Sequence, residues 1–308
     1  MAEIDKEKLK AEIRRLAQER DAVILAHYYV DGDVQDVADF VGDSYALAKT
    51  ARGDPRKTVV FCGVTFMGES ACVLNPDKTV LIPETSAVCP MALMVDAEKI
   101  RAMREKYDDL AVVCYINSTA EFKSLSDVCV TSSNALKVVR ALKNKNIFFI
   151  PDGNLGRFIA EQVPEKNFIL NDGFCHVHTS ITARDIETAF REHPGSKIIA
   201  HPECMKEVCD MADFIGSTKE LIEFTESDGA GSFIVCTESG VLHEMRKRSP
   251  GKQFFSVGAR QVCPNMKKIT LEKVRDCLAG MTPRARVSEE LRDSSSRPLE
   301  RMLELASR

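Results

Sequence analysis

Short apolar runs alternate with amphipathic stretches along most of this sequence. The pattern predicts three short apolar strands that end in polar side chains, at residues 22–29, 110–117 and 196–203. Further along, each of these strands is followed by a stretch with helical spacing and then by another apolar run. Strands that alternate with helical patterns are typical of βαβ units and of parallel sheets. The pattern therefore predicts an α/β fold.

The same order of strands and helices occurs three times. Every copy has a strand that leads into a glycine-containing turn and a helix, and a last strand that ends in a cysteine. These cysteines are Cys89, Cys175 and Cys263; 86 residues separate the first two and 88 the last two. A nearly constant period indicates repeated structural units. We expect three α/β/α domains with small parallel sheets, related by pseudo-threefold symmetry. One large α/β fold, such as a barrel, is the alternative, but it does not explain the matched ends of the copies.

The cysteines also set the domain boundaries that we predict. The first repeat spans 1–89, the second spans 90–175, and the third spans 176–308, which includes Cys263 and the C-terminal helices.

Charge and hydropathy exclude several classes of protein. The net charge is −4 and the N-terminal stretch is charged rather than apolar, so neither a basic nucleic-acid surface nor a signal peptide is indicated. No apolar run reaches the roughly 18 residues needed to span a bilayer. We therefore expect a cytoplasmic protein with no nucleic-acid or membrane partner.

The chain has eleven cysteines, an odd number that disulfides cannot use completely. In a reducing compartment they are expected to be free thiols. Cys62, Cys114 and Cys236 lie within or at the end of apolar runs and are interpreted as core residues, because a free thiol behaves as a small hydrophobic group. Cys204 and Cys209 receive no role.

Polar residues gather where the first strand of each repeat ends. In open α/β sheets, ligands bind outside the carboxyl ends of the strands. If the three domains turn these ends inward, the polar side chains and the three cysteines share one cavity, so we expect the active site at the central junction. The polar side chains are those of His27, Tyr29, Tyr115, Asn117, His201 and Glu203. Histidine can shuttle protons near neutral pH, and glutamate and tyrosine can serve as acids, bases or orienting groups.

Three thiolates from three domains suit a metal centre. Structural zinc takes four ligands, often as paired C-x₂-C knuckles, and this sequence has no such pair. An iron–sulfur cluster on three cysteines leaves one iron open as a Lewis acid. His176 and His178, close after Cys175, are candidate ligands or orienting residues. We favour the cluster; catalytic zinc and three buried structural thiols stay open as alternatives.

Hydroxyl residues precede or begin a predicted helix in each repeat: Ser44, Ser132 with Ser133, and Ser217 with Thr218. Serine and threonine are good N-caps, and Ser217 has the capping-box spacing to Glu220. Helix N-termini also favour carboxylate or phosphate, because their N–H groups are free and the helix dipole is positive there. We therefore expect a ligand with several negative charges.

The strings AHYY with GDS, SAVCPMA, YINS, TSSNA, FCHVH, HPEC, GST and QVCPNMK occur in this order. In these motifs the chain resembles the quinolinate synthase family, from near its N-terminus to about Lys268. The resemblance implies a three-domain fold around a 4Fe–4S cluster held by Cys89, Cys175 and Cys263, with no protein ligand on the fourth iron. It also implies that iminoaspartate and dihydroxyacetone phosphate react to quinolinate, phosphate and water, a step of NAD biosynthesis.

The resemblance further implies roles for single residues. Tyr29 resembles an acid–base residue, and His27, His201 and Glu203 are the other catalytic candidates. The residues that resemble substrate contacts are His27, Ser44, Tyr115, Asn117, Ser132, His201, Glu203 and Thr218.

Two details complicate the resemblance. Our alignment of the repeats places Ser133 opposite Ser44, whereas the family motif indicates Ser132, which we follow. Some family members carry a C-x-x-C pair near the C-terminus, proposed as a redox switch; this chain has only Cys277 there. Thiol regulation of that type is therefore not expected.

Two other classes of protein are alternatives to this family: other enzymes with a cluster bound by three domains, and metal-dependent sensors. The diphthamide-forming radical enzymes and a reductase of isoprenoid synthesis also hold a cluster with one cysteine from each of three domains, but the HPEC and YINS motifs favour the quinolinate synthases. A metal-dependent sensor of a small acid would be expected to carry a DNA-binding or partner-binding module, for which the sequence has no signal. The predicted partners are thus the two small substrates; transient contact with the enzyme that supplies iminoaspartate stays open.

Overall fold

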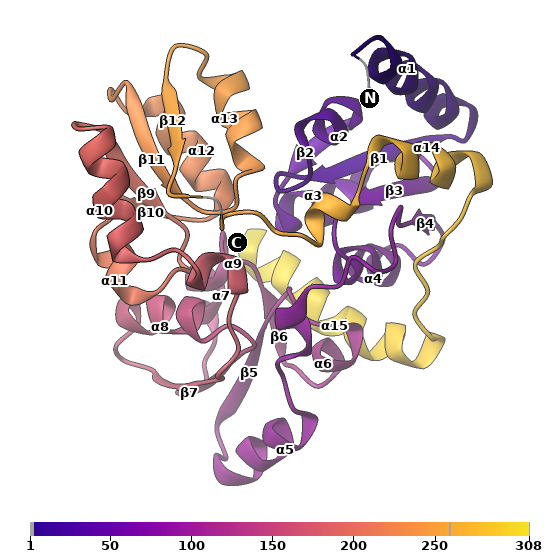
Figure 1. Ribbon diagram of the computed structural model, residues 1–308. Coiled ribbons are helices and arrows are strands. Elements are labelled where there is room, and N and C mark those ends of the chain that lie inside the picture. The colour runs from indigo at the N-terminus through magenta and orange to yellow at the C-terminus, as the bar shows by residue number, and fades with distance from the viewer. Residues whose placement is uncertain (1–2, 259, 308) are drawn as a thin grey trace. The chain divides into compact units, whose positions relative to one another are not determined.

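Figure 1 shows a computed structural model of the chain, in which residues 3–258 and 260–307 are described. The strands form three four-stranded sheets, and all neighbouring strands in them are parallel. The strand orders are β2-β1-β3-β4, β6-β5-β7-β8 and β10-β9-β11-β12. Each sheet therefore has the same topology, which confirms the predicted α/β fold with three small parallel sheets.

The first sheet contains β1 (Ala22–His27), β2 (Phe40–Gly42), β3 (Thr58–Cys62) and β4 (Thr79–Leu81). Its helices are α1 (Glu3–Glu19), α2 (Gly32–Val37), α3 (Ser44–Gly53), α4 (Thr65–Leu74) and, from the C-terminal part of the chain, α14 (Leu271–Gly280).

The second sheet contains β5 (Leu110–Tyr115), β6 (Val128–Val130), β7 (Asn146–Ile150) and β8 (Asn167–Leu170). Its helices are η1 (Pro90–Leu93), α5 (Ala97–Lys106), α6 (Ala120–Ser124), α7 (Ala135–Ala141) and α8 (Gly153–Gln162).

The third sheet contains β9 (Lys197–Ala200), β10 (Phe214–Ile215), β11 (Ser232–Cys236) and β12 (Gln253–Ser256). The remaining helices are α9 (His176–Thr179), α10 (Ala183–Glu192), α11 (Lys206–Asp210), α12 (Thr218–Ser227), α13 (Val241–Arg248), η2 (Met266–Lys268) and α15 (Glu289–Ser307).

The chain forms two compact units. Unit 1 comprises the chain up to Cys89 together with Pro264–Ser296, and it contains the first sheet; unit 2 comprises Pro90–Cys263 together with the chain from Arg297, and it contains the other two sheets. Within unit 1, α1 lies beside α14 (Figure 1), and Nη2 of Arg20 donates to the carbonyl of Ala279 at 3.2 Å. The three domain boundaries set by the cysteines stay a prediction.

The central strands of the sheets are buried on both faces. All residues of β1, β3 and β5 are buried, and such continuous apolar runs are typical of parallel strands with helices on either side. Cys62, Cys114 and Cys236 are each 0% exposed, which confirms their interpretation as core residues. Because each fully buried aliphatic side chain contributes about 1.5–3 kcal/mol, these strands form the hydrophobic cores.

An aspartate anchors the second strand of every sheet to the first. Its Oδ2 accepts a hydrogen bond from a backbone N–H of the first strand, and its own N–H donates back to the same residue's carbonyl. The pairs, each 15 residues apart with an N–Oδ2 distance of 2.7 Å, are Ile24–Asp39, Val112–Asp127 and Ile198–Asp213. The repeat therefore extends from the backbone topology to single side chains.

A lysine before the fourth strand of each sheet binds the C-terminal end of the helix that follows the second strand. Lys78, Lys166 and Lys252 each donate from Nζ to two carbonyl oxygens at or near the ends of α3, α7 and α12. The last carbonyls of a helix have no partner within it, and a cation there is favoured by the helix dipole. These lysines are 88 and 86 residues apart, so they follow the same period as the cysteines.

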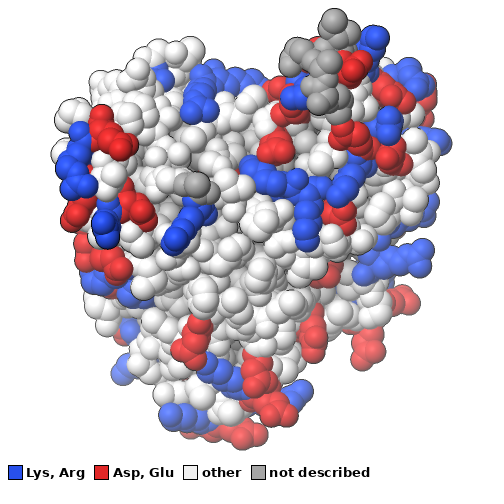
Figure 2. Space-filling model, in the orientation of Figure 1, with Lys and Arg blue, Asp and Glu red and all other residues white. Residues whose placement is uncertain are grey.

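The surface carries both signs of charge. Basic and acidic side chains are interspersed on the face shown in Figure 2. Among the described residues, no helix combines the length and the apolar character that crossing a membrane requires.

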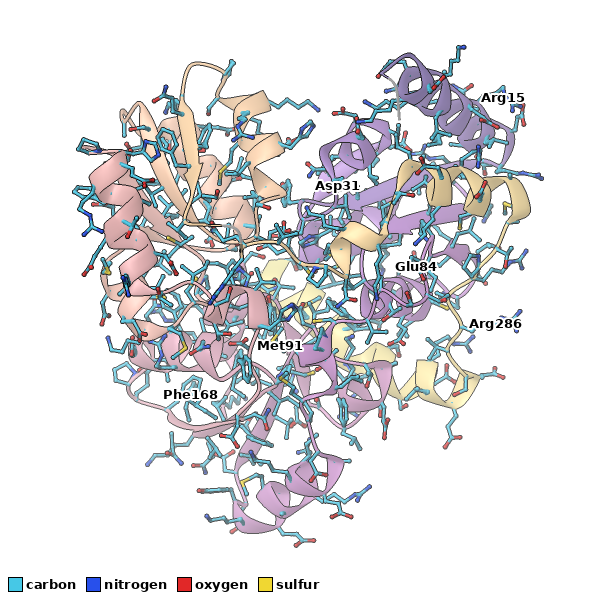
Figure 3. The ribbon with its side chains drawn as sticks, in the orientation of Figure 1. Arg15, Asp31, Glu84, Met91, Phe168 and Arg286 are labelled. Carbon is cyan, nitrogen blue, oxygen red and sulfur yellow. The ribbon has the colours of Figure 1, made fainter. Side chains whose placement is uncertain are left out.

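The segment between β4 and Cys89 is fixed by residues from the C-terminal part of unit 1. Nζ of Lys273 lies 2.5 Å from Oε2 of Glu84, which is labelled in Figure 3. Oε1 of Glu84 accepts from the N–H of Ser86 at 2.8 Å, and Nζ of Lys268 donates to the Ser86 carbonyl at 2.8 Å. The ion pair with Lys273, together with the bonds from Ser86, lowers the pKa of Glu84 to about 2.

Replacing the repeated aspartate should weaken its sheet. Asp127→Ala removes the acceptor for the Val112 N–H, and we expect the free energy of unfolding, measured by urea denaturation, to fall by about 1–2 kcal/mol. Asp127→Asn, which keeps an acceptor oxygen, should lose less. Asp172→Ala is the control, because that side chain is 97% exposed and its ion pair should contribute little. An equal loss in the control would contradict the anchoring role.

The Glu84–Lys273 pair should make stability depend on pH. The folded pKa of Glu84 lies below its usual value of 4.5, so its contribution is complete above that value and is lost as the pH falls toward about 2. Because Lys273 is 39% exposed, we expect Glu84→Gln to cost only about 1 kcal/mol at pH 7. The difference between wild type and variant, from urea denaturation, should shrink steadily below pH 4.5. A difference that stays constant down to pH 3 would refute this account.

Candidate functional site

Polar side chains from two sheets meet at the carboxyl ends of the strands in unit 2. Tyr115 ends β5, whereas His201 and Glu203 follow β9, and all three are at most 5% exposed. The Tyr115 hydroxyl donates to Oε1 of Glu203 at 2.5 Å, across 88 residues of sequence. The N–H of Glu203 donates to Nδ1 of His201 at 3.3 Å. The structure therefore brings three of the predicted site residues together.

His178 completes this group from α9. Its Nδ1 lies 3.0 Å from Oε2 of Glu203, its Nε2 lies 2.9 Å from the hydroxyl of Thr237, and its ring stacks on that of His201 with centroids 4.7 Å apart. Thr237, which follows β11, is fully buried. A continuous polar chain thus runs from Thr237 through His178 and Glu203 to Tyr115.

The charge on Glu203 is stabilised although the group is buried. Burial by itself raises the pKa of Glu203, but the neighbouring imidazoles of His178 and His201 and the hydrogen bonds from His178 and Tyr115 lower it to about 2. Glu203 is therefore ionised at neutral pH, where it can orient proton donors but is a weak base.

Strand pairing establishes which residues of the three repeats are equivalent. Ala26, Cys114 and Ala200 pair with the last residues of β3, β7 and β11. The next residues are His27, Tyr115 and His201, and two positions later come Tyr29, Asn117 and Glu203. Six of the predicted site residues therefore occupy two backbone positions in each of three sheets.

The same registers align the hydroxyl residues. His27 pairs with Gly42 and Tyr115 pairs with Val130, each two residues before the serine in question. Ser132 is therefore the residue equivalent to Ser44, as the family motif indicated, and the alignment of Ser133 with Ser44 was wrong.

The helix caps differ from the sequence expectation in two repeats. Asp43, not Ser44, caps α3 by accepting from the Ala46 N–H at 2.8 Å. Asn134 occupies the cap position of α7, although its side chain makes no capping bond. Ser217 does cap α12 and forms the predicted capping box with Glu220, which leaves the buried Thr218 as the first residue of the helix.

In unit 1, His27 and Tyr29 lie side by side. Their rings form an edge-to-face pair with centroids 4.6 Å apart, and the Tyr29 N–H donates to Nδ1 of His27 at 3.2 Å. This turn matches that of His201 and Glu203. Nζ of Lys267 donates to the carbonyl of Tyr29 at 2.8 Å and thereby fixes the turn.

Asn117 has an unused acceptor. Its Oδ1 is buried, and no hydrogen-bond partner for it occurs in the part of the chain that the structure describes. Since buried polar atoms are normally paired, this oxygen is suited to a donor on a bound ligand.

The three loops that carry Cys89, Cys175 and Cys263 are anchored in the same way. A backbone N–H at the start of the helix after the third strand, or two residues before it, donates to the carbonyl two residues before each cysteine. The pairs are Thr65–Ala87 at 2.9 Å, Gly153–Gly173 at 2.8 Å and Ser239–Gln261 at 2.8 Å. All three cysteines are half-buried thiols rather than disulfides, which leaves their sulfur atoms chemically suited to bind a metal.

Buried carboxylates hold the two cysteine loops of unit 2. Oε1 of Glu238 accepts from the Cys263 N–H at 3.0 Å, and its Oε2 accepts from the Gly240 N–H at 2.6 Å. Asp152 caps α8 through Leu155 and also interacts with the Cys175 N–H. Burial, and then the charge of Glu203, raises the pKa of Asp152.

One group of side chains in the described residues has the geometry of a metal site. Ligand atoms of Cys175, His178 and Glu203 all lie within 4.8 Å of one another. His176, the other candidate, is half-buried; burial, followed by the proximity of His178, lowers its pKa.

Sequence reasoning missed Thr237, Asp152 and Glu238. All three follow the third strand of a sheet, after β7 or β11, whereas the residues predicted from the sequence lie at the ends of the first and last strands. A polar residue directly after each apolar run was the available signal.

Comparison with known proteins agrees with the motifs. A family profile described as quinolinate synthetase A protein matches residues 11–304. The quinolinate synthase of Fusobacterium nucleatum is 49% identical over 97% of this chain and 99% of its own length. That of Caldicellulosiruptor bescii is 48% identical over 97% and 99%, and that of Clostridioides difficile is 44% identical over 97% and 98%. The chain therefore belongs to the quinolinate synthase family of enzymes.

Proposed function

We propose that this chain condenses iminoaspartate with dihydroxyacetone phosphate to quinolinate, phosphate and water, in the cytoplasm. The observation that carries the proposal is the buried chain of Tyr115, Glu203, His178 and Thr237 in a member of this family, because it supplies oriented proton carriers at the strand ends where α/β proteins bind ligands. Transient contact with the enzyme that supplies iminoaspartate, an unstable compound, is part of the same proposal.

The cofactor in this proposal is a 4Fe–4S cluster on Cys89, Cys175 and Cys263. The donor set fits: three half-buried thiols lie at equivalent positions on loops with the same backbone anchor, and thiolates are the preferred ligands of such clusters. When bound, the cluster would supply an open iron that acts as a Lewis acid on a departing hydroxyl.

Ionised Glu203 supports proton transfer rather than accepting protons itself. Glu203 accepts a hydrogen bond from the Tyr115 hydroxyl and contacts Nδ1 of His178, and Thr237 contacts Nε2 of the same ring. A tyrosine or imidazole fixed in this way can give or take a proton without first reorganising. In unit 1, Tyr29 is the proposed acid–base residue, oriented by His27.

Substrate binding is assigned to the residues that share the equivalent strand-end and helix-start positions. The buried Oδ1 of Asn117 can accept a hydrogen bond from a substrate. The N-termini of α3 and α12 favour the carboxylates and the phosphate of the substrates. The proposed contacts are His27, Ser44, Tyr115, Asn117, Ser132, His201, Glu203 and Thr218.

The first test is metal analysis with turnover on the same sample, purified without oxygen. We expect about four iron and four sulfide per chain together with quinolinate formation. Cys89→Ala, Cys175→Ala and Cys263→Ala should each lose both, whereas Cys209→Ala, at a buried thiol of α11, should keep both. Stoichiometric zinc in place of iron, or a complete cluster without quinolinate, would overturn the proposal.

The tyrosine hydroxyl should matter to turnover but not to cluster content. Tyr115→Phe removes the bond to Glu203, and we expect kcat to fall by about 10²–10⁴-fold, the range for loss of a proton-transfer group. Iron and sulfide content should be unchanged. Tyr107→Phe, which alters the tyrosine at the end of α5, is the matched control and should keep full kcat. Wild-type kcat in Tyr115→Phe would remove this residue from the mechanism.

A further inference from the structure

The side chains of Cys175, His178 and Glu203 lie close enough together to bind a single metal ion. A thiolate, an imidazole and a carboxylate are the three ligand types that zinc takes in proteins, at bond lengths of about 2.0–2.3 Å. Ligands of a tetrahedral ion at those lengths lie about 3.3–3.8 Å apart. Here the ligand atoms are within 4.8 Å of one another, so small side-chain rotations are enough to close the site on an ion.

The two inner ligands already have outer partners of the kind that metal sites use. Thr237 contacts Nε2 of His178 at 2.9 Å, which leaves Nδ1 facing Glu203. Because a hydroxyl can donate or accept, Thr237 can accept a hydrogen bond from a protonated Nε2, and in that tautomer the lone pair of Nδ1 is available to the ion. Tyr115 binds Oε1 of Glu203 and leaves Oε2 for the ion. Such contacts orient metal ligands and strengthen binding.

The charges also suit a divalent ion. Cys175 loses its thiol proton to solvent on binding, so a thiolate, a carboxylate and a neutral imidazole together balance a charge of +2. His178 and Glu203 are 1% and 3% exposed, and a buried site that is neutral overall avoids the cost of an uncompensated charge.

We propose that the cluster-free protein binds one Zn²⁺ ion through Cys175, His178 and Glu203, and that this ion prevents cluster assembly. Water completes the coordination, as in zinc sites with three protein ligands. The ion occupies the Cys175 thiolate, which the cluster also needs, so the two states exclude each other. Zinc binding stands on the geometry of unit 2 alone; the competition with the cluster rests on the proposed function.

Of the three proposed cluster cysteines, only Cys175 is a ligand of the proposed zinc site. Cys89 and Cys263 are proposed cluster ligands but are no part of the zinc site. A zinc ion bound instead by the three cluster thiols would need all of them. Single-residue variants therefore distinguish the two arrangements.

The experiment is a zinc titration of the cluster-free full chain, without oxygen, in competition with a chromogenic chelator. We expect one Zn²⁺ per chain. Cys175→Ser and His178→Gln should weaken binding at least 100-fold, and Thr237→Val, which keeps all three ligands, should weaken it about tenfold or more. Cys89→Ala, Cys263→Ala and, as a matched control, Cys209→Ser should bind as the wild type does. Loss of binding in Cys89→Ala or Cys263→Ala, or full binding in His178→Gln, would overturn the site.

Cluster assembly is measured separately, from the visible absorbance after reconstitution with iron and sulfide. One equivalent of Zn²⁺ added first should suppress assembly in the wild type but not in His178→Gln, which retains the three cysteines. Assembly in the wild type despite bound zinc would refute the competition. Failure of assembly without zinc would instead refute the proposed cofactor, while the zinc titration would still decide the site.

Discussion

The buried carboxylate of Glu203 is the constraint on which the site in unit 2 depends. A charge that is 3% exposed is tolerated only when hydrogen bonds and opposite charge replace the water it has lost. Tyr115 and His178 supply these contacts, and His201 lies against the same group. The ends of two separate sheets are thereby tied to one carboxylate, so the proposed catalytic group also contributes to the packing of unit 2.

The three repeats share the same backbone framework, and the polar residues of the proposed site occupy two positions at the strand ends. The sheets share strand order, an anchoring aspartate, a helix-binding lysine and the backbone bond that holds each cysteine loop. At the strand ends, one position holds His27, Tyr115 and His201, and the position two residues later holds Tyr29, Asn117 and Glu203. A parallel sheet fixes where a side chain emerges but places little demand on its chemistry, so the three copies could acquire different roles without changing the fold.

Prearranged polar groups serve more than one purpose at this site. Thr237 and Tyr115 hold His178 and Glu203 in fixed orientations, which favours proton transfer because no reorganisation is needed. Ligands held in fixed orientations also bind a metal ion more tightly. With Cys175 beside them, the groups proposed for catalysis are also the groups proposed to bind zinc.

The sequence by itself determined the fold class, the threefold repeat and the three cysteines, because hydrophobic periodicity and constant spacing are local properties of the chain. It also indicated His201 and Glu203 as polar residues at strand ends. Only the tertiary structure decided that His178 joins Thr237 to Glu203 and that Asp43 rather than Ser44 caps α3. The two residues that the ring nitrogens of His178 contact are 25 and 59 residues away in sequence. The cap depends on which of two adjacent polar side chains the backbone directs at the free N–H groups. Such contacts between distant residues form only when the chain folds and brings the ends of the parallel strands together.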